Sequence, residues 1–298
     1  MEKNTAMRNN NAGVPDICIL YRRKNMEQKE RLNYLVKAFI SDSEEYRHLQ
    51  PSADEKQNKV LLRSLMNIRM PKPIDPEVLG IQDDYLRQRN RENGIIGASD
   101  IRTVSASGSD VPFADTLAIW QGDITRLGLD AIVNAANSQM LGCFIPMHTC
   151  IDNCIHTYAG IQLRAACNQE MRKLRALYGS DYEQPVAVPM LTDGYNLPAG
   201  KVIHIVGPIV KDRLTKELEE DLAACYANTL DLCLANGLKT VAFCCLSTGV
   251  FRFPKKRAAE IAVSSVIQWL TDHPDTMDKI VFNVFGDEDK YCYEKILL

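Results

Sequence analysis

The sequence lacks the features of several large protein classes. None of its apolar runs approaches the ~20 residues that a membrane-spanning helix needs, and its first residues, MEKNTAMRNNNAGVPD, lack the apolar core of a secretory signal. A basic excess is also missing, because 35 Lys and Arg stand against 38 Asp and Glu, which gives a net charge of −3. We therefore expect a cytoplasmic protein that contacts no membrane and no nucleic acid, since nucleic-acid binding relies on a basic face.

Histidine is scarce as well, with five residues, whereas cysteine is not, with ten. Cysteines spread over a chain without a secretory signal indicate reduced thiols rather than a disulfide framework. Three of them lie with two histidines in the short stretch from Cys143 to His156. The other cysteines have apolar neighbours and are expected in the core; they are Cys18, Cys167, Cys225, Cys233, Cys244, Cys245 and Cys292.

Helical periodicity dominates residues 25–105, which we interpret as a helical extension. One apolar stripe runs from Leu32 to Ile40 at helical spacing. A second stripe runs from Val60 to Met66 and ends at the prolines of MPKPIDP, and a third helix is expected from Pro76 to Arg91. We expect residues 1–24 to be a flexible terminus.

Strands and helices alternate in residues 106–298. Strands are expected at 116–122, 131–136, 185–191, 201–210, 240–246 and 279–286, and helices at 151–178, 214–236, 255–272 and 287–297. This alternation predicts an α/β domain of three layers, α/β/α, with a mixed, mostly parallel central sheet. Ligands of such sheets bind beyond the carboxyl ends of the strands, where the loops meet.

Polar motifs follow the first two expected strands. In WQGDIT, Asp123 is either the N-cap of a short helix or an acceptor for a base amino group or a hydroxyl. In IVNAAN, Asn134 and Asn137 present amide groups beside small alanines, which suits either a plain turn or a bound ligand.

The motif LSTGVFRFPKK closes the fifth expected strand and opens a helix. Its Ser247, Thr248 and Gly249 allow successive backbone N–H groups to point into one concavity, which favours an anion such as a diphosphate. Phe251 would cover that ligand, and Arg252 either adds a phosphate contact or points to solvent. A turn of this kind also occurs without any ligand.

In their order and spacing, GDIT, VNAAN and STGVF resemble the macrodomain family, which binds ADP-ribose. The resemblance covers about residues 110–298 and implies a three-layer macrodomain. The implied contacts are Asp123 and Ile124 for the adenine, Asn134 and Asn137 for the distal ribose, and Ser247, Thr248, Gly249, Val250 and Phe251 for the diphosphate.

Macrodomains commonly place a glycine-rich loop after VNAAN, whereas this chain has GCFIPMHTCIDN. That loop resembles the zinc-dependent branch of the family, in which a Cys, a His and a second Cys bind the metal. The resemblance implies one zinc ion per chain, bound by Cys143, His148 and Cys150. Two thiolates and one imidazole suit zinc and leave a fourth position for water or substrate.

Cys154 and His156 are rival ligands, although we expect them on a helix that begins near Asp152. A closed structural zinc site would need one of them as its fourth ligand and would favour an interaction protein. The same stretch also suits a metal-free loop or a redox pair of thiols. The helical extension resembles the extension found in the zinc-dependent branch.

The resemblance implies a zinc-dependent mono-ADP-ribosyl hydrolase that removes ADP-ribose from Asp and Glu side chains of modified proteins. The metal would lie at the distal ribose, because its loop begins a few residues after Asn137, and there it can polarise an oxygen or activate water. We expect Asn137 and Asp152 to be catalytic, and Cys150 and Ile151 to contact the substrate as well. Asp152 is alternatively a ribose-orienting residue or a purely structural helix N-cap.

Two other functions would use the same residues: an ADP-ribose reader without hydrolysis, and an O-acetyl-ADP-ribose deacetylase. The branch is associated with a sirtuin-type ADP-ribosyltransferase and with a lipoyl-carrier protein. That association implies an ADP-ribosylated protein as the substrate, with a lipoylated carrier as the candidate.

Overall fold

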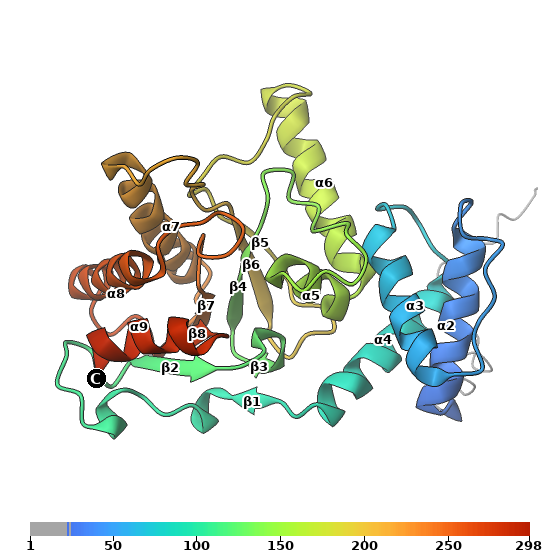
Figure 1. The fold of residues 1–298 in the computed structure, drawn as a ribbon, viewed down its shortest axis with the longest axis horizontal. Coiled ribbons are helices and arrows are strands. Elements are labelled where there is room, and N and C mark those ends of the chain that lie inside the picture. The colour runs from blue at the N-terminus through green and yellow to red at the C-terminus, as the bar shows by residue number, and fades with distance from the viewer. Residues whose placement is uncertain (1–22, 24) are drawn as a thin grey trace, which may run out of the picture.

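The computed structural model describes residue 23 and residues 25–298. The terminus expected to be flexible, residues 1–24, lies outside the described residues except for Arg23. Figure 1 shows a helical part and a larger sheet-containing part, which an extended segment through β1 connects. Among the described residues, no helix has the length and apolar character needed to cross a membrane.

The helical extension consists of α2 (Gln28–Asp42), α3 (Glu55–Ile68) and α4 (Pro76–Glu92). Helix α2 packs against both of the others, and their apolar side chains form a core separate from the core of the sheet. The apolar stripe of α2 is confirmed, because Leu32 and Leu35 are fully buried. The stripe predicted for α3 is wrong at one position, since Val60 is 49% exposed.

Ile101 and Val104 already belong to the core of the sheet. They follow β1 (Ile96–Gly97), which pairs in parallel with β3 (Leu127–Gly128). The boundary expected between residues 105 and 106 stays a prediction, but apolar packing joins the connecting segment to the larger part before that point.

The central sheet has the strand order β2-β8-β7-β4-β6-β5. Neighbouring strands are parallel except for the antiparallel pair β5 and β6, so the predicted mixed, mostly parallel sheet is confirmed. The strands are β2 (Leu117–Gln121), β4 (Ala131–Ala135), β5 (Met190–Asp193), β6 (Lys201–Ile205), β7 (Thr240–Cys244) and β8 (Lys279–Val284).

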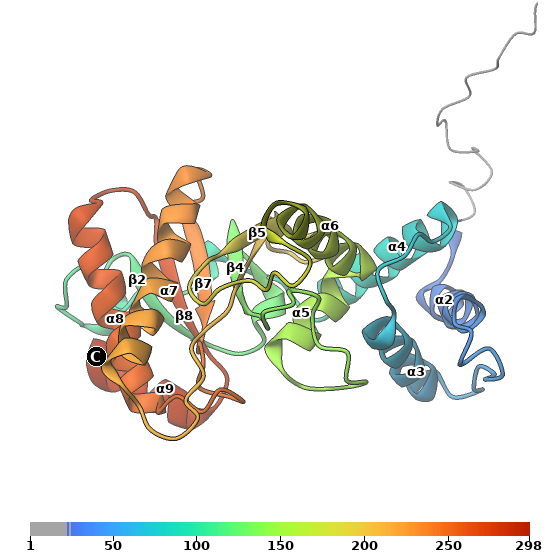
Figure 2. The same ribbon diagram turned by 90° about the horizontal axis from the view of Figure 1, so that it is seen from above.

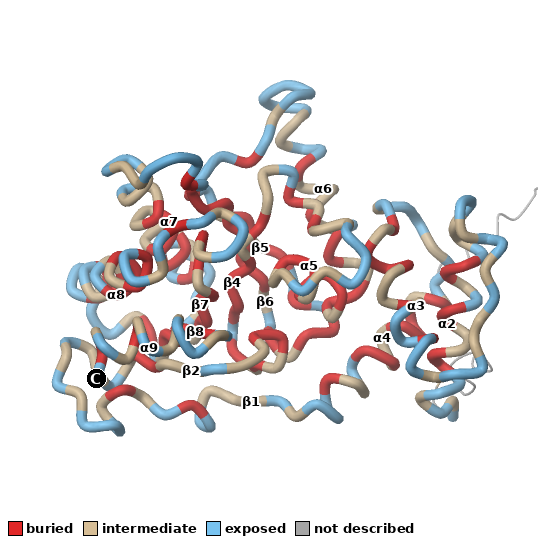
Figure 3. Tube along the Cα trace, viewed as in Figure 1, coloured by how far each residue is buried: buried red, intermediate tan, exposed pale blue. Residues whose placement is uncertain are grey.

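Helices flank this sheet, as the predicted α/β/α layering requires (Figures 1 and 2). Helix α5 packs on β4, α6 on β5, α7 on β6, and α9 on β2 and β8. Figure 3 shows β4 buried in the middle of the molecule. The flanking helices are α5 (Ile151–Ala159), α6 (Ile161–Tyr178), α7 (Lys216–Ala235), α8 (Lys255–Asp272) and α9 (Asp287–Leu297), and the 3-10 turns are η1 (Ala98–Asp100), η2 (Ser105–Ser107) and η3 (Ile124–Arg126).

Three expected elements are wrong in extent. The strand expected at 201–210 ends at Ile205, shortly before Gly207 and Pro208. The strand expected at 185–191 begins only at Met190, because Pro185 and Pro189 lack the N–H that a strand ladder needs. The single helix expected at 151–178 is two helices that meet at Gly160. That glycine has a φ of +96°, and a Cβ there would lie 2.6 Å from the side chain of Gln162.

The cysteines expected in the core divide into three groups. Four are buried, two are half-buried, and Cys18 lies outside the described residues. The buried ones are Cys167, Cys225, Cys233 and Cys244, and the half-buried ones are Cys245 and Cys292.

Candidate active site and metal site

The loop between β4 and α5 brings three predicted metal ligands together. Gly142, with a φ of +80°, turns the chain toward Cys143, and a Cβ at Gly142 would lie 2.8 Å from the His156 ring. At the other end of the loop, Cys150 is the N-cap of α5, and its Sγ accepts a hydrogen bond from the backbone of Asn153. The ligand atoms of Cys143, His148 and Cys150 all lie within 4.8 Å of one another.

The geometry of these three residues fits a zinc ion. The Cys143 Sγ lies 3.6 Å from the His148 Nδ1, and tetrahedral zinc with ordinary bond lengths separates sulfur and nitrogen ligands by about 3.5 Å. Burial, together with the neighbouring Cys143, raises the pKa of the Cys150 thiol to about 12. A thiolate at this position therefore needs a cation beside it, and metal coordination deprotonates a thiol outright.

The rival ligands Cys154 and His156 lie on α5, as expected. The Cys154 Sγ lies 3.6 Å from the Arg63 guanidinium, which donates to it. His156 is buried and belongs with Cys167 and His204 to a second group of metal-type side chains. Neither rival joins the first group among the described residues, so that group offers three candidate ligands.

Hydrogen bonding argues against a metal in the second group. The Nδ2 of Asn134 lies 3.0 Å from the Nδ1 of His204 and is a donor, so this ring nitrogen accepts. The Nε2 of His204 then carries the proton, and it faces the Thr192 hydroxyl at 3.0 Å and the Cys167 thiol at 3.6 Å. A protonated nitrogen has no lone pair for a metal.

Two asparagines and an aspartate meet beside the metal loop. Asp152 lies in the first turn of α5, and its carboxylate accepts from Asn134 Nδ2 at 2.8 Å and from Asn137 Nδ2 at 3.4 Å. Burial raises the pKa of Asp152 to about 6, while the Asn134 hydrogen bond and Arg164 lower it. The alternative that Asp152 is the helix N-cap is wrong, because Cys150 has that position.

The loop after β2 contains the predicted adenine contacts. The Asp123 Oδ1 accepts from the Thr125 backbone at 3.0 Å and from its hydroxyl at 2.6 Å, so the capping interpretation of Asp123 is confirmed. The Ile124 side chain is 3% exposed and part of the core. A ligand would therefore meet Ile124 at its backbone. The turn η3 packs against α5, which brings these residues toward the metal loop.

The loop after β7 is a tight backbone turn. Ser247 has a φ of +63°, and its carbonyl accepts from the Phe253 N–H at 3.0 Å. The Phe251 carbonyl accepts from the Val210 N–H at 2.9 Å, which ties the loop to the segment that follows β6. Gly249 is exposed, whereas the Ser247 Oγ is buried without a protein partner. The other predicted contacts of this loop are Thr248, which is half-buried, and Val250, which is 76% exposed.

These groups share one edge of the sheet. The strands β2, β8, β7, β4 and β6 are parallel, so their carboxyl ends lie on the same side. Along that edge, in strand order, come Asp123, the end of β8, Ser247 and the Asn134–Asn137 pair. A nucleotide bound in an extended conformation along this edge would meet these residues in the same order, with its base at Asp123, its phosphates at Ser247 and its terminal sugar at the asparagines.

Sequence reasoning missed a residue at the end of β8. Phe285 follows this strand directly and is 80% exposed, between the loops that follow β2 and β7. A large exposed aromatic ring at the ligand edge of a sheet is suited to stacking on a base. The signal was present in VFNVFG, where an aromatic residue immediately precedes the glycine at the start of a helix.

Comparisons with known proteins agree with this geometry. A profile of the Macro domain family matches residues 133–262. A protein-ADP-ribose hydrolase of Treponema medium is 45% identical over 272 residues, which are 91% of this chain and 100% of that protein. A Fusarium oxysporum f. sp. cubense protein named "Probable bifunctional ADP-ribose hydrolase/ADP-ribosyltransferase" is 40% identical over 87% of this chain and 45% of its own length.

A solved structure has the same architecture. The Trypanosoma brucei macrodomain in complex with ADP-ribose aligns with a TM-score of 0.59 and 27% identity, over 83% of this chain and 97% of that one. The predicted macrodomain fold is therefore confirmed. The chain belongs to the macrodomain family and, within it, to the protein-ADP-ribose hydrolases.

Proposed function

Starting from this family membership, we propose that the protein is a zinc-dependent hydrolase that removes mono-ADP-ribose from Asp and Glu side chains of modified proteins. One observation supports this most directly. The Asn137 Nδ2 donates both to Asp152 and to the carbonyl of Gly142, which is bonded to the ligand residue Cys143. The metal loop and the asparagine pair are thus parts of one hydrogen-bonded unit.

ADP-ribose would lie along the edge of the sheet. Its adenine would meet Asp123, the Ile124 backbone and the ring of Phe285, and its diphosphate would meet the backbone N–H groups of the loop after β7. Its distal ribose would then meet the Asn134–Asn137 pair together with Ile151 and Asp152. Zinc held by Cys143, His148 and Cys150 would, when bound, supply Lewis-acid chemistry next to this ribose.

The asparagines and Asp152 would position the reacting sugar. Asp152 accepts from the amides of both asparagines, so it fixes the direction in which each amide presents its remaining polar atom. The Asn134 Oδ1 is buried and has no protein partner. Preorganised polar groups of this kind act on a substrate without rearranging, and so they favour catalysis.

An ester of Asp or Glu is the linkage that best suits these residues. A carboxylate leaves readily, so its departure needs no strong general acid, and apart from Asp152 the loops contain no candidate for one. We also propose an ADP-ribosylated protein, with a lipoylated carrier as the candidate, and a functional link to a sirtuin-type ADP-ribosyltransferase. The Fusarium protein, whose name joins a hydrolase with a transferase, supports that link.

The test is a hydrolysis assay combined with elemental analysis. The purified chain should contain one zinc ion and should release ADP-ribose from an aspartyl- or glutamyl-ADP-ribosylated protein, and a chelator should stop the release. Unchanged cleavage after complete zinc removal would contradict a catalytic metal. ADP-ribose binding without any cleavage would favour the reader, and cleavage of O-acetyl-ADP-ribose alone would favour the deacetylase.

A further inference from the structure

The metal loop, residues 141–150, is held from outside by side chains of the helical extension. The Arg63 Nη2, on α3, donates to the carbonyl of His148 at 2.7 Å and to the Oδ1 of Asn153 at 2.9 Å. The Asn153 Nδ2 in turn donates to the carbonyl of Ile145 at 2.9 Å and to that of Cys143 at 3.3 Å. A single arginine therefore reaches two metal ligands, one directly and one through an amide.

A second side chain of α3 holds the strained part of this loop. Met147 has a φ of +58°, a left-handed conformation that residues other than glycine rarely adopt. Its backbone N–H donates to the Oδ1 of Asn67 at 3.0 Å. The Nδ2 of Asn67 donates to the hydroxyl of Thr157 on α5 at 2.8 Å, so Asn67 is fixed at both ends of its amide. The ligand His148 is the next residue after Met147.

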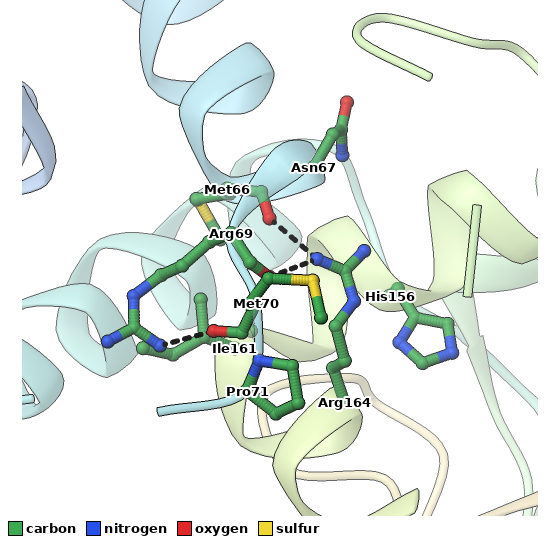
Figure 4. A pocket seen from close by; sticks show the side chains of 9 residues that line it. Met66, Asn67, Arg69, Met70, Pro71, His156, Ile161 and Arg164 are labelled. Carbon is green, nitrogen blue, oxygen red and sulfur yellow. Dashed lines mark hydrogen bonds between the residues drawn. The ribbon is translucent and has the colours of Figure 1, made fainter. Parts of the chain in front are cut away.

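A third side chain joins the start of the loop to the same helix. Arg164, on α6, donates to the carbonyl of Leu141 at 2.7 Å and to the carbonyls of Met66 and Arg69 at 3.2 and 2.6 Å. Figure 4 shows its guanidinium beside these two carbonyls, at the wall of a cavity of about 10 Å³. Burial lowers the pKa of Arg164 to about 10, so the group stays charged at neutral pH.

We propose that Arg63 and Asn67 are positioning residues for the zinc ligands, so that the helical extension is a working part of the metal site. The inference rests on the proposed function in that it takes zinc to be the ion held by the loop. Both side chains bind the loop through its backbone and not through its exposed side chains. They therefore control where the ligand residues lie. Zinc needs this control because its bonds to sulfur and nitrogen have a narrow range of lengths.

A plain structural contact would behave differently. If the extension merely packed on the larger part, loss of one contact would lower stability and leave metal affinity unchanged. Groups that orient metal ligands change affinity by about 10- to 100-fold when they are removed. Zinc affinity is therefore the readout that separates the two cases, and it does not depend on hydrolysis.

The experiment compares full-length Arg63→Met and Asn67→Ala with the matched control Lys59→Met. Lys59 lies one turn before Arg63 on α3, and its ammonium pairs with Glu55 at the surface. Zinc dissociation constants would come from competition with a chromophoric chelator, and circular dichroism would verify folding. We expect about 10- to 100-fold weaker zinc binding for the two variants, an unchanged constant for the control and partial recovery for Arg63→Lys, which keeps the cation.

A second measurement needs no metal. In zinc-free protein, the Met147 amide should exchange hydrogen slowly in the wild type and at least tenfold faster in Asn67→Ala, because that substitution removes its acceptor. Folded variants with zinc affinity and exchange within twofold of the wild type would overturn the inference alone. A wild-type chain that hydrolyses its substrate without holding zinc would instead overturn the proposed function, and the positioning of zinc ligands with it.

Discussion

The metal loop (residues 141–150) and the loop after β7 (residues 247–253) lie at the same edge of the sheet, but they are held in different ways. The loop after β7 is held by backbone bonds, two of them within the loop, from Phe253 to Ser247 and from Arg252 to Gly249, and one from Val210 to Phe251. The metal loop is held mainly by side chains of distant residues, such as Arg63 and Asn67.

The difference concerns what each loop has to do. An anion-binding loop needs only backbone N–H groups pointing in one direction, which a short turn supplies by itself. A metal site needs three side chains with fixed relative positions, and a ten-residue loop without helix or strand cannot fix them alone. Long-range side-chain contacts then provide the rigidity. Substitutions in the helical extension should therefore change zinc binding by the metal loop (the metal side) and leave nucleotide binding by the loop after β7 (the phosphate side) unchanged.

The largest effect is expected for a substitution that removes zinc binding and leaves nucleotide binding intact. Cys143→Ala removes one of three ligands, so zinc retention and hydrolysis should both fall by at least about 100-fold, more than for a residue that only orients a ligand. ADP-ribose binding should stay within a few fold, because the loop after β7 contains none of the three candidate zinc ligands. Elemental analysis and calorimetry would measure the two quantities. Loss of nucleotide binding together with zinc would show that the two loops are one cooperative unit.

A substitution after β6, next to the loop after β7, should lower ADP-ribose affinity and leave zinc affinity unchanged. A Cβ at Gly207 would overlap the buried Ser247 Oγ, so Gly207→Ala must displace Ser247. Overpacking of this kind costs about 1–3 kcal/mol, and we expect ADP-ribose affinity to fall about tenfold while zinc affinity stays unchanged. Isothermal calorimetry with each ligand would check this, and equal losses of both affinities would contradict it.

Acid should destabilise the fold through the buried imidazole of His204, which lies beside Asn134. Burial lowers the pKa of His204 to about 3, below the value near 6.5 of the unfolded chain, so between these values the unfolded chain binds more protons. The free energy of unfolding should therefore fall as pH drops from 6.5 toward 3, by up to about 1.4 kcal/mol per pH unit for one group.

Urea titrations at several pH values would measure this slope. His204→Gln should remove about one proton's contribution from it, while His156, whose pKa burial also lowers, keeps its own. His273, the C-cap residue of α8, serves as the control, because it is half-buried and its ring bonds to the carbonyl of Trp269 in the same helix. An unchanged slope in His204→Gln would show that this imidazole does not titrate on unfolding.

The smallest effect is expected at Arg252. Its side chain is exposed, and its guanidinium donates to the Lys211 carbonyl at 3.4 Å. Arg252→Ala should change ADP-ribose affinity less than about threefold, because interactions of solvent-exposed charges contribute little free energy. Calorimetry at low and high salt would check it. A tenfold loss that salt suppresses would instead make Arg252 a phosphate ligand.

Much of the fold follows from local sequence patterns. Apolar runs predicted the strands, and the prolines of MPKPIDP predicted the end of α3, but Pro185 and Pro189 delay β5, β6 ends before Gly207, and Gly160 divides a helix. These errors arose because an apolar run such as PVAVPML resembles a strand unless the missing backbone donors are counted.

The sequence by itself determined the candidate site residues, because motifs at strand ends keep their spacing whatever surrounds them. It also identified Cys143, His148 and Cys150 as a set, since few chemistries use two thiols and an imidazole in one loop. The residues that hold this loop were decided only by tertiary structure. Arg63 lies 85 residues from the carbonyl it binds, and no local pattern relates two positions that meet only when the extension packs against α5.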